Sequence, residues 1–274
     1  MPSLQDLKIY TDSLKAYSHK MPAYFLGHGS PMNALEENEF TRTWQHIGQD
    51  LPKPRAILCI SAHWETKGTF VTAMEAPRTI HDFYGFPRAL FEVQYPAAGN
   101  KEVAELTQQL VQKTQIGLDH EWGFDHGSWS VIRHIYPQAD VPLLQLSIDY
   151  SKPAVWHYEL AKELSELRKK GVLIIGSGNI VHNLRTINWQ QKEGGYDWAE
   201  EVNESVKNLI LQDNHRPLQQ FEKLGSAAAL AIPTPEHYLP LLYTLGVKEE
   251  GEQVSFLNDK LLMGSLSMTS VKVG

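Results

Sequence analysis

Residues 23–31 read Ala-Tyr-Phe-Leu-Gly-His-Gly-Ser-Pro, an apolar run that ends at a glycine-flanked histidine, His28. The same order recurs at three other places, where an apolar run leads within a few residues to His63, His182 or His237. The four runs are residues 23–26, 56–60, 172–175 and 227–232. Short apolar runs bounded by glycine or proline are typical of buried strands, so we expect four strands here.

Strands of this kind bring their histidines together if they share a sheet. In open α/β sheets, ligands bind in the crevice at the carboxyl ends of the strands. Imidazole is the commonest side-chain metal ligand, and it titrates near neutral pH. His28 and His63, joined by one further ligand, would form the minimum set for a catalytic metal with open positions. The pattern therefore predicts a metal-dependent enzyme.

Three further histidines are candidates for the same site. His237 follows a rigid Pro-Thr-Pro-Glu segment and is the expected third ligand, with Glu236 as its carboxylate rival. His182 follows the turn at residues 176–179, which suits either a fourth ligand or a general acid or base beside the metal. His126 is a candidate for hydrogen bonding to a ligand or for proton transfer.

Composition limits the classes of function. The chain has 274 residues, of which 42% are hydrophobic and 21% charged, as in an ordinary globular protein. Its formal net charge of −7 argues against nucleic-acid binding, which needs a basic surface. No stretch approaches the roughly 18 apolar residues of a membrane span, and residues 1–20 do not resemble a secretory signal. The single cysteine, Cys59, lies in an apolar run, so we expect a buried thiol and a cytoplasmic protein.

Strands and helices alternate along most of the chain, which predicts an α/β fold. We expect one domain over residues 1–274, built as a three-layer α/β/α sandwich around a central mixed sheet. Expected helices cover residues 35–51, 100–115, 153–170, 197–212 and 235–246, with a short one ending near residue 136. Further strands are expected at residues 69–74, 143–148, 253–257 and 265–273, the last two as an antiparallel edge. Residues 75–100 form a long aromatic-rich loop, and loops of this length often wall a pocket.

Six motifs carry a family resemblance. They are Leu-Gly-His-Gly-Ser-Pro (26–31), Ser-Ala-His-Trp (61–64), Ile-His-Asp-Phe (80–83), Gly-Phe-Asp-His-Gly-Ser-Trp (123–129), Asn-Ile-Val-His-Asn-Leu (179–184) and Pro-Thr-Pro-Glu-His-Tyr (233–238). In this order they resemble the class III extradiol ring-cleavage dioxygenases, and within them the bacterial and plant branch that acts on DOPA. The resemblance extends from about residue 21 to the C-terminus. It implies a mononuclear metal, non-haem Fe(II) for ring cleavage, although such proteins can also carry zinc.

The resemblance also implies roles for the histidines. His28, His63 and His237 match the ligand positions, although the better-known branch has a glutamate where His237 stands. An all-histidine site is therefore implied, and zinc binds such nitrogen ligands well. His182 falls where the family places its catalytic histidine, and as a fourth imidazole it is the alternative zinc ligand when substrate is absent. Together with His126 it would accept and return protons during the reaction.

The reaction implied is extradiol cleavage by O2 of a small aromatic diol, such as the 4,5-cleavage of L-DOPA to a yellow muconic semialdehyde. Aromatic side chains are expected to line the substrate pocket, and each of them could equally pack in the core. These candidates are His81, Tyr84, Phe86, Trp129 and Tyr243. Two alternatives stay open: a zinc hydrolase that uses His182 as base, and a non-catalytic metal-binding member of the family.

Overall fold

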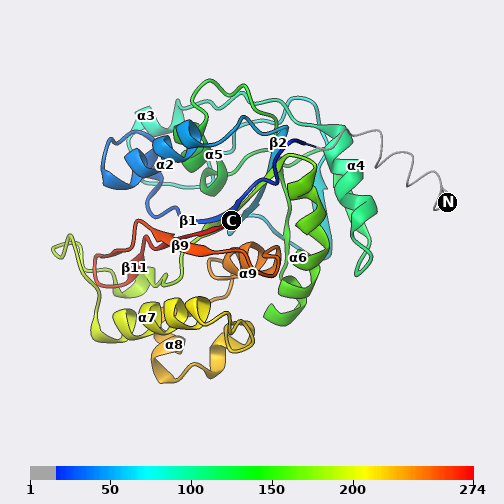
Figure 1. The fold of residues 1–274 in the computed structure, drawn as a ribbon. Helices are drawn as coiled ribbons and strands as arrows, with labels where there is room; N and C mark the ends of the chain where they lie inside the picture. Colours follow the sequence, from blue (N-terminus) through cyan, green and yellow to red (C-terminus); the bar gives the residue numbers. More distant parts are fainter. Residues whose placement is uncertain (1–16) are drawn as a thin grey trace.

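A six-stranded mixed sheet forms the centre of the computed structural model, which describes residues 17–274 (Figure 1). The strands lie in the order β6-β2-β8-β1-β12-β9. Their bounds are β1 Ala23–Gly27, β2 Ala56–Ser61, β6 Leu143–Gln145, β8 Val172–Gly178, β9 Val254–Leu257 and β12 Ser270–Val273. The first four strands of this order run parallel to one another, and β12 and β9 add an antiparallel edge. The mixed sheet and its edge confirm the fold predicted from the sequence.

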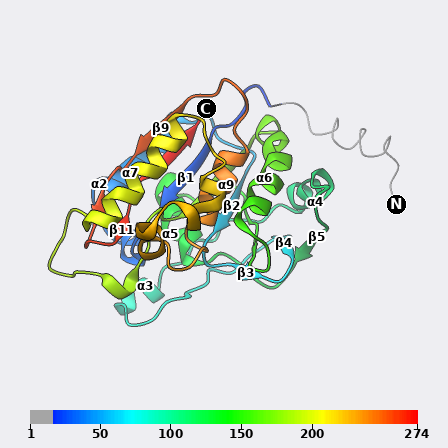
Figure 2. The ribbon, with the colours of Figure 1, turned by 90° about the horizontal axis from the view of Figure 1, so that it is seen from below.

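Helices cover both faces of this sheet, which completes the three layers (Figures 1 and 2). Alternate residues of each central strand enter opposite cores, as the two-residue period of a strand requires. In β2, for example, Leu58 packs with residues of α4, α6, α7 and α9, whereas Ile57 packs with residues of α2 and α5. The helices are α2 Glu39–Asp50, α4 Lys101–Leu110, α5 His126–Ile135, α6 Ala154–Lys169, α7 Asp197–Leu211 and α9 Leu239–Gly246.

Local capping explains where several helices begin and end. The Asn38 side chain accepts hydrogen bonds from the first turn of α2, so the helix expected from residue 35 starts at Glu39. Asn100 caps α4 in the expected way. Helix α6 begins just after Pro153 and ends before Gly171, whose φ of 82° suits glycine.

One of the four strand predictions is wrong, namely that of residues 227–232 before His237. Residues Ser226–Ala231 form a helix, α8, rather than a strand. Four of its six residues are alanine, the residue with the highest helix propensity. Ala227, Ala228 and Ala231 are buried while Leu230 is exposed, which is a helical pattern and not the alternation of a strand. His237 is therefore carried to the site by the loop between α8 and α9.

Other expected elements differ in extent or partner. The helix expected over residues 100–115 stops at Leu110, and after a short loop the chain forms β5, Ile116–Asp119. This strand pairs with β4, Thr69–Thr72, in a separate two-stranded sheet. The strand expected at residues 143–148 is divided into β6 and β7, Ile148–Asp149, and β7 pairs with β3, Glu65–Thr66.

The remaining elements are short. They are η1 Pro31–Ala34, α3 Arg88–Phe91, η2 Leu184–Thr186, η3 Leu218–Lys223, β10 Leu261–Leu262 and β11 Leu266–Ser267. Within residues 17–274, none of the helices is long and apolar enough to cross a membrane. Most of the segment considered for a secretory signal, residues 1–16, lies outside the described residues. Cys59 is fully buried in β2, and burial raises the pKa of its thiol, so it is an inert core residue as expected.

Candidate metal centre

The carboxyl ends of β1, β2 and β8 lie level with one another. Gly27, the last residue of β1, pairs with Gly178, the last residue of β8. Ser61, the last residue of β2, pairs with Ser177, the residue before the end of β8. His28 follows β1 directly, and His63 follows β2 after one intervening residue. The ring centroids of these two histidines are 5.1 Å apart. The predicted convergence of histidines at this edge of the sheet is therefore present.

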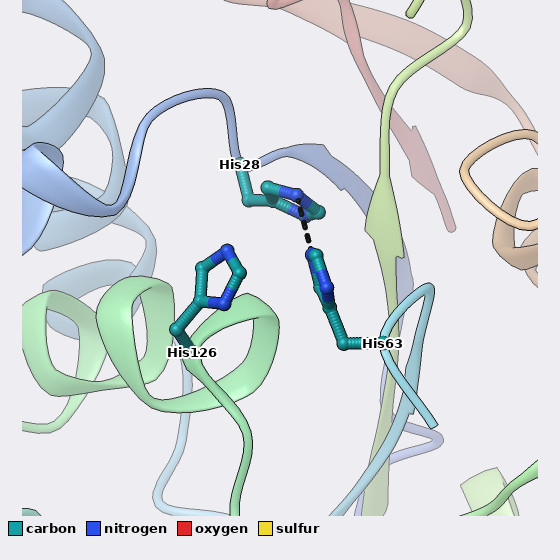
Figure 3. A group of neighbouring side chains, drawn as sticks. All are labelled: His28, His63 and His126. Carbon is teal, nitrogen blue, oxygen red and sulfur yellow. Dashed lines mark hydrogen bonds between the residues drawn. The ribbon is translucent and has the colours of Figure 1, made fainter. Parts of the chain in front are cut away.

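The Nε2 atoms of His28 and His63 face each other at 3.3 Å (Figure 3). Zinc–imidazole bonds are about 2.0–2.1 Å long, so two nitrogens bound tetrahedrally to one ion stand about 3.3–3.4 Å apart. The observed separation fits that geometry. The two imidazoles can therefore serve as neighbouring ligands of a single ion.

His126, at the start of α5, completes a group of three. Its ligand nitrogen and those of His28 and His63 all lie within 4.8 Å of one another. Figure 3 shows the three rings turned toward a common space. The sequence pointed to His126 for hydrogen bonding or proton transfer, and its placement adds the capacity to bind metal.

A second group adjoins the first. His237, Glu236 and His182 also bring their ligand atoms within 4.8 Å of one another. The His237 ring lies 5.2 Å from that of His28 and 5.1 Å from that of His63, measured between centroids. His182 stacks on His237 at 3.5 Å with nearly parallel planes. All five histidines singled out for the site thus lie together.

The loop that carries His237 is held against the end of β8. The Asn179 amide donates a hydrogen bond to the His237 carbonyl at 2.9 Å. A Cβ at Gly178 would lie only 2.1 Å from the same carbonyl oxygen, so only glycine permits this approach. The end of β8 therefore determines the position of His237.

Hydrogen bonds at Nδ1 leave Nε2 available on three of the rings. The Ser177 hydroxyl donates to the Gly127 carbonyl, so at 3.0 Å it accepts from His28 Nδ1. The Nδ1 of His126 lies 2.9 Å from Asp82 and that of His237 lies 3.1 Å from Glu236, both carboxylate acceptors. A proton on Nδ1 leaves the Nε2 lone pair free for a metal. The donor set therefore fits a divalent ion that binds imidazole nitrogen.

Burial keeps the imidazoles of His28, His63, His182 and His237 neutral. Loss of solvent, reinforced by neighbouring histidines, lowers the pKa of His28 and of His237 well below 6.5. Burial likewise lowers the pKa of His63 to about 3 and that of His182 to about 4. Neutral imidazole is the form that binds metal and the form that accepts a proton. At pH 7 these imidazoles can therefore bind a metal or accept a proton.

A buried polar network lies beside the histidines, and no motif in the sequence predicted it. Asp125, the N-cap of α5, is fully buried and accepts hydrogen bonds at 2.6 Å from both Ser61 and Gln145. Burial, together with the charge of Asp82, raises the pKa of Asp125. These residues come from separate parts of the chain, and no spacing pattern connects them.

The expected aromatic pocket residues have different placements. Trp129 is fully buried and donates from Nε1 to the Ile80 carbonyl, and His81 Nε2 bonds the Val93 carbonyl, so both hold the loop at residues 75–100. Phe83, which was not among the expected pocket residues, stands closer to the centre, with its ring 5.6 Å from that of His126. Phe86 packs on Phe83.

Two of the residues expected to contact substrate, Tyr84 and Tyr243, lie away from the histidine cluster. Tyr84 is 92% exposed to solvent. Tyr243 is fully buried in α9, where its hydroxyl bonds His157 of α6 at 2.9 Å. Its position within a helix directs it into the core between α9 and α6, away from the histidine cluster.

Comparisons with known proteins agree with this geometry. The family described as the catalytic LigB subunit of aromatic ring-opening dioxygenase matches residues 16–273. The chain is 51% identical over 262 residues to 4,5-DOPA dioxygenase extradiol of Escherichia coli (strain K12), covering 94% of this chain and 96% of that protein. It is 32% identical over 256 residues to 4,5-DOPA dioxygenase extradiol of Beta vulgaris, covering 91% and 95%.

A solved structure has the same fold. The crystal structure of an uncharacterised protein from Escherichia coli K12 is similar with a TM-score of 0.81 and 46% sequence identity. The match covers 93% of this chain and 100% of that one. The chain therefore belongs to the family of the catalytic LigB subunit of aromatic ring-opening dioxygenases.

Proposed function

We propose that this protein is an extradiol dioxygenase that opens the ring of L-DOPA or a closely related catechol by 4,5-cleavage. The observation that carries the proposal is the cluster of neutral imidazoles, with the His28 and His63 Nε2 atoms 3.3 Å apart at the sheet edge. Two relatives that match nearly the whole chain are named 4,5-DOPA dioxygenase extradiol. The whole chain would act as one catalytic domain, and its lone buried cysteine suits the cytoplasm.

One divalent metal, Fe(II) for ring cleavage and Zn(II) as the alternative in purified protein, would be held by His28, His63 and His237. When bound, such an ion supplies a Lewis acid that lowers the pKa of the catechol hydroxyls and brings the diol and O2 together. His126 is the rival third ligand, because its nitrogen joins the His28 and His63 group. We assign it to proton transfer, because His28, His63 and His237 are the histidines that match the ligand positions of the resemblance, and a neutral imidazole beside them can accept and return a proton.

His182 is proposed as the base that takes a proton from the catechol and returns it to the product. Burial lowers the pKa of this imidazole to about 4, so at pH 7 it has a free lone pair. It stacks on His237 at 3.5 Å, and its backbone amide is anchored to the Ala231 carbonyl at 2.9 Å. A base that is fixed beside a ligand can act on a diol oxygen bound next to that ligand.

The test is reconstitution of the protein with Fe(II) without oxygen, followed by L-DOPA and air. Oxygen uptake matched mole for mole by a yellow semialdehyde supports extradiol cleavage. Zn(II)-loaded protein is the control, since zinc has no redox chemistry and should give no uptake. Bound iron with no oxygen uptake on L-DOPA or on simple catechols would overturn the proposal and favour the hydrolase or non-catalytic alternatives.

A further inference from the structure

One carboxylate, that of Asp82, contacts two histidines of the cluster from the side away from the metal position. Its Oδ2 lies 2.9 Å from His126 Nδ1 and 3.4 Å from His63 Nδ1. Its Oδ1 accepts a hydrogen bond from the His126 backbone amide at 2.8 Å. Both oxygens are therefore occupied, and each serves a histidine.

This arrangement determines which nitrogen of each ring carries the proton. An ionised carboxylate only accepts hydrogen bonds, so it favours the form of His63 and of His126 with hydrogen on Nδ1. In that form the Nε2 lone pairs are free, and the Nε2 of His63 is the atom that faces His28 at 3.3 Å. Without Asp82 nothing in these contacts would prevent either ring from placing its proton on Nε2, where it would block a metal.

We propose that Asp82 is a positioning residue that sets the tautomer and the ring orientation of His63 and His126 together. The inference rests on the proposed use of His63 as a metal ligand. Carboxylates that orient a ligand histidine in this way typically change metal affinity or activity 10–100-fold when they are removed. Because a single carboxylate serves both rings, its loss should disturb ligand binding and proton transfer at the same time.

The loop at residues 75–100 holds Asp82 in place from several sides. The backbone amide of Ile80 donates to the Phe124 carbonyl at 2.7 Å, and the Ile80 carbonyl accepts from Trp129 Nε1 at 2.8 Å. On the other side of Asp82, Phe83 packs its ring edge-on against His126. The carboxylate is therefore delivered by a loop that is anchored to α5 and the segment before it. This gives the long loop a role in building the centre besides walling it.

The test uses Asp82→Ala and Asp82→Asn, with Glu92→Gln as the matched control. Glu92 lies on the same loop, but its carboxylate is exposed and pairs with Arg88. Long-range proton–nitrogen NMR of the metal-free protein reports the tautomer of each histidine without any activity. Competition with a chelator for Zn(II) then gives the dissociation constant.

We expect Nδ1-protonated His63 and His126 in the unaltered protein and in Glu92→Gln. In Asp82→Ala both rings should shift toward the Nε2-protonated form, and the Zn(II) dissociation constant should rise 10–100-fold. Asp82→Asn has one acceptor oxygen instead of two. Its tautomer populations and its Zn(II) dissociation constant should therefore lie between those of the unaltered protein and those of Asp82→Ala. It also keeps the shape of the side chain if Asp82→Ala fails to fold.

Unchanged tautomers and a dissociation constant within twofold in Asp82→Asn and in any folded Asp82→Ala would overturn the inference. The result is separable from the proposed function. If the unaltered protein takes up no oxygen but the tautomers shift as expected, the proposed reaction is wrong and the role of Asp82 stands. If ring cleavage occurs but the Asp82 variants keep their tautomers and bind Zn(II) normally, the proposed reaction stands and the role of Asp82 is wrong.

Discussion

The backbone of Gly127 packs directly against the side chain of His63. A Cβ at Gly127 would stand 2.7 Å from His63 Cδ2 and 2.5 Å from Ser61 Oγ. The Gly127 carbonyl accepts a hydrogen bond from Ser177, whose hydroxyl in turn accepts from His28 Nδ1. The first turn of α5 therefore orients two proposed ligands, one by close packing and the other through a hydroxyl.

Gly127→Ala should displace His63 and weaken metal binding at least tenfold. The added methyl cannot be accommodated unless His63 or Ser61 shifts, and such overpacking costs about 1–3 kcal/mol. Chelator competition for Zn(II) gives the affinity, and urea unfolding gives the stability. Gly85→Asn is the control, because Gly85 has open space around it and asparagine tolerates its positive φ. Normal affinity in Gly127→Ala would show that His63 does not depend on this contact.

Single histidine variants should separate ligands from proton-transfer groups. His28→Ala, His63→Ala and His237→Ala should each lose stoichiometric Fe(II), measured by elemental analysis after desalting. His126→Ala should retain it, because this side chain is assigned to proton transfer. Loss of iron from His126→Ala with retention in His237→Ala would exchange the two roles.

His182→Ala should keep its iron and lose turnover. Removing a general acid–base group typically lowers the rate by a factor of about 10²–10⁴. Single-turnover oxygen uptake with L-DOPA measures the step directly, and iron content provides the control. If turnover is unchanged, His182 is not the base; if iron is lost, it is a ligand.

Stability of the metal-free protein should fall as the pH is lowered from about 6.5 to 4. Burial holds the pKa of His63 at about 3 and that of His182 at about 4, against 6.5 for a free imidazole. In this window the unfolded chain binds more protons than the folded one, so acid favours unfolding. Each such histidine contributes up to about 1.4 kcal/mol per pH unit. Urea titrations at pH 7 and pH 5 measure the change, and His182→Gln should reduce it; equal stabilities at both pH values would contradict the prediction.

Arg168→Met should destabilise the fold by about 3–5 kcal/mol, because it removes the buried partner of Glu252, leaves that carboxylate with Lys20 alone, and leaves two buried carbonyls without their donor. Arg168 is 1% exposed and forms two hydrogen bonds of 2.7 Å with Glu252 and two of 2.8 Å with the Met21 and Val247 carbonyls. Although burial opposes it, hydrogen bonding from Arg168 and Lys20 lowers the pKa of Glu252 to about 2.

The matched control for Arg168→Met is Arg88→Met, which removes an exposed partner of Glu92. Exposed pairs of this kind contribute about 0–1 kcal/mol. Urea unfolding of both variants compares the two ion pairs. An equal loss of unfolding free energy in the two variants would show that burial does not strengthen the Arg168–Glu252 ion pair.

The amino-acid sequence by itself determined the features that depend on near neighbours along the chain. Short apolar runs predicted β1, β2 and β8, and the histidines just after two of these runs predicted a metal site at one sheet edge. Asn100, Pro153 and Gly171 marked helix ends because capping acts within one turn. These signals are local, so they can be read without knowing what packs against them.

Only the tertiary structure decided the features that depend on contacts between distant segments. The apolar run at residues 227–232 fits a strand or a short helix equally, and packing of its alanine face selects the helix. Asp82 meets His126 across 44 residues and Ser177 meets His28 across 149, so their roles have no trace in local spacing. Tyr84 and Tyr243 were indistinguishable from pocket residues until the fold directed one into solvent and the other into the core. The ends of β1 and β2 bring His28 and His63 together, whereas contacts between distant segments, formed only on folding, place the residues that orient their rings.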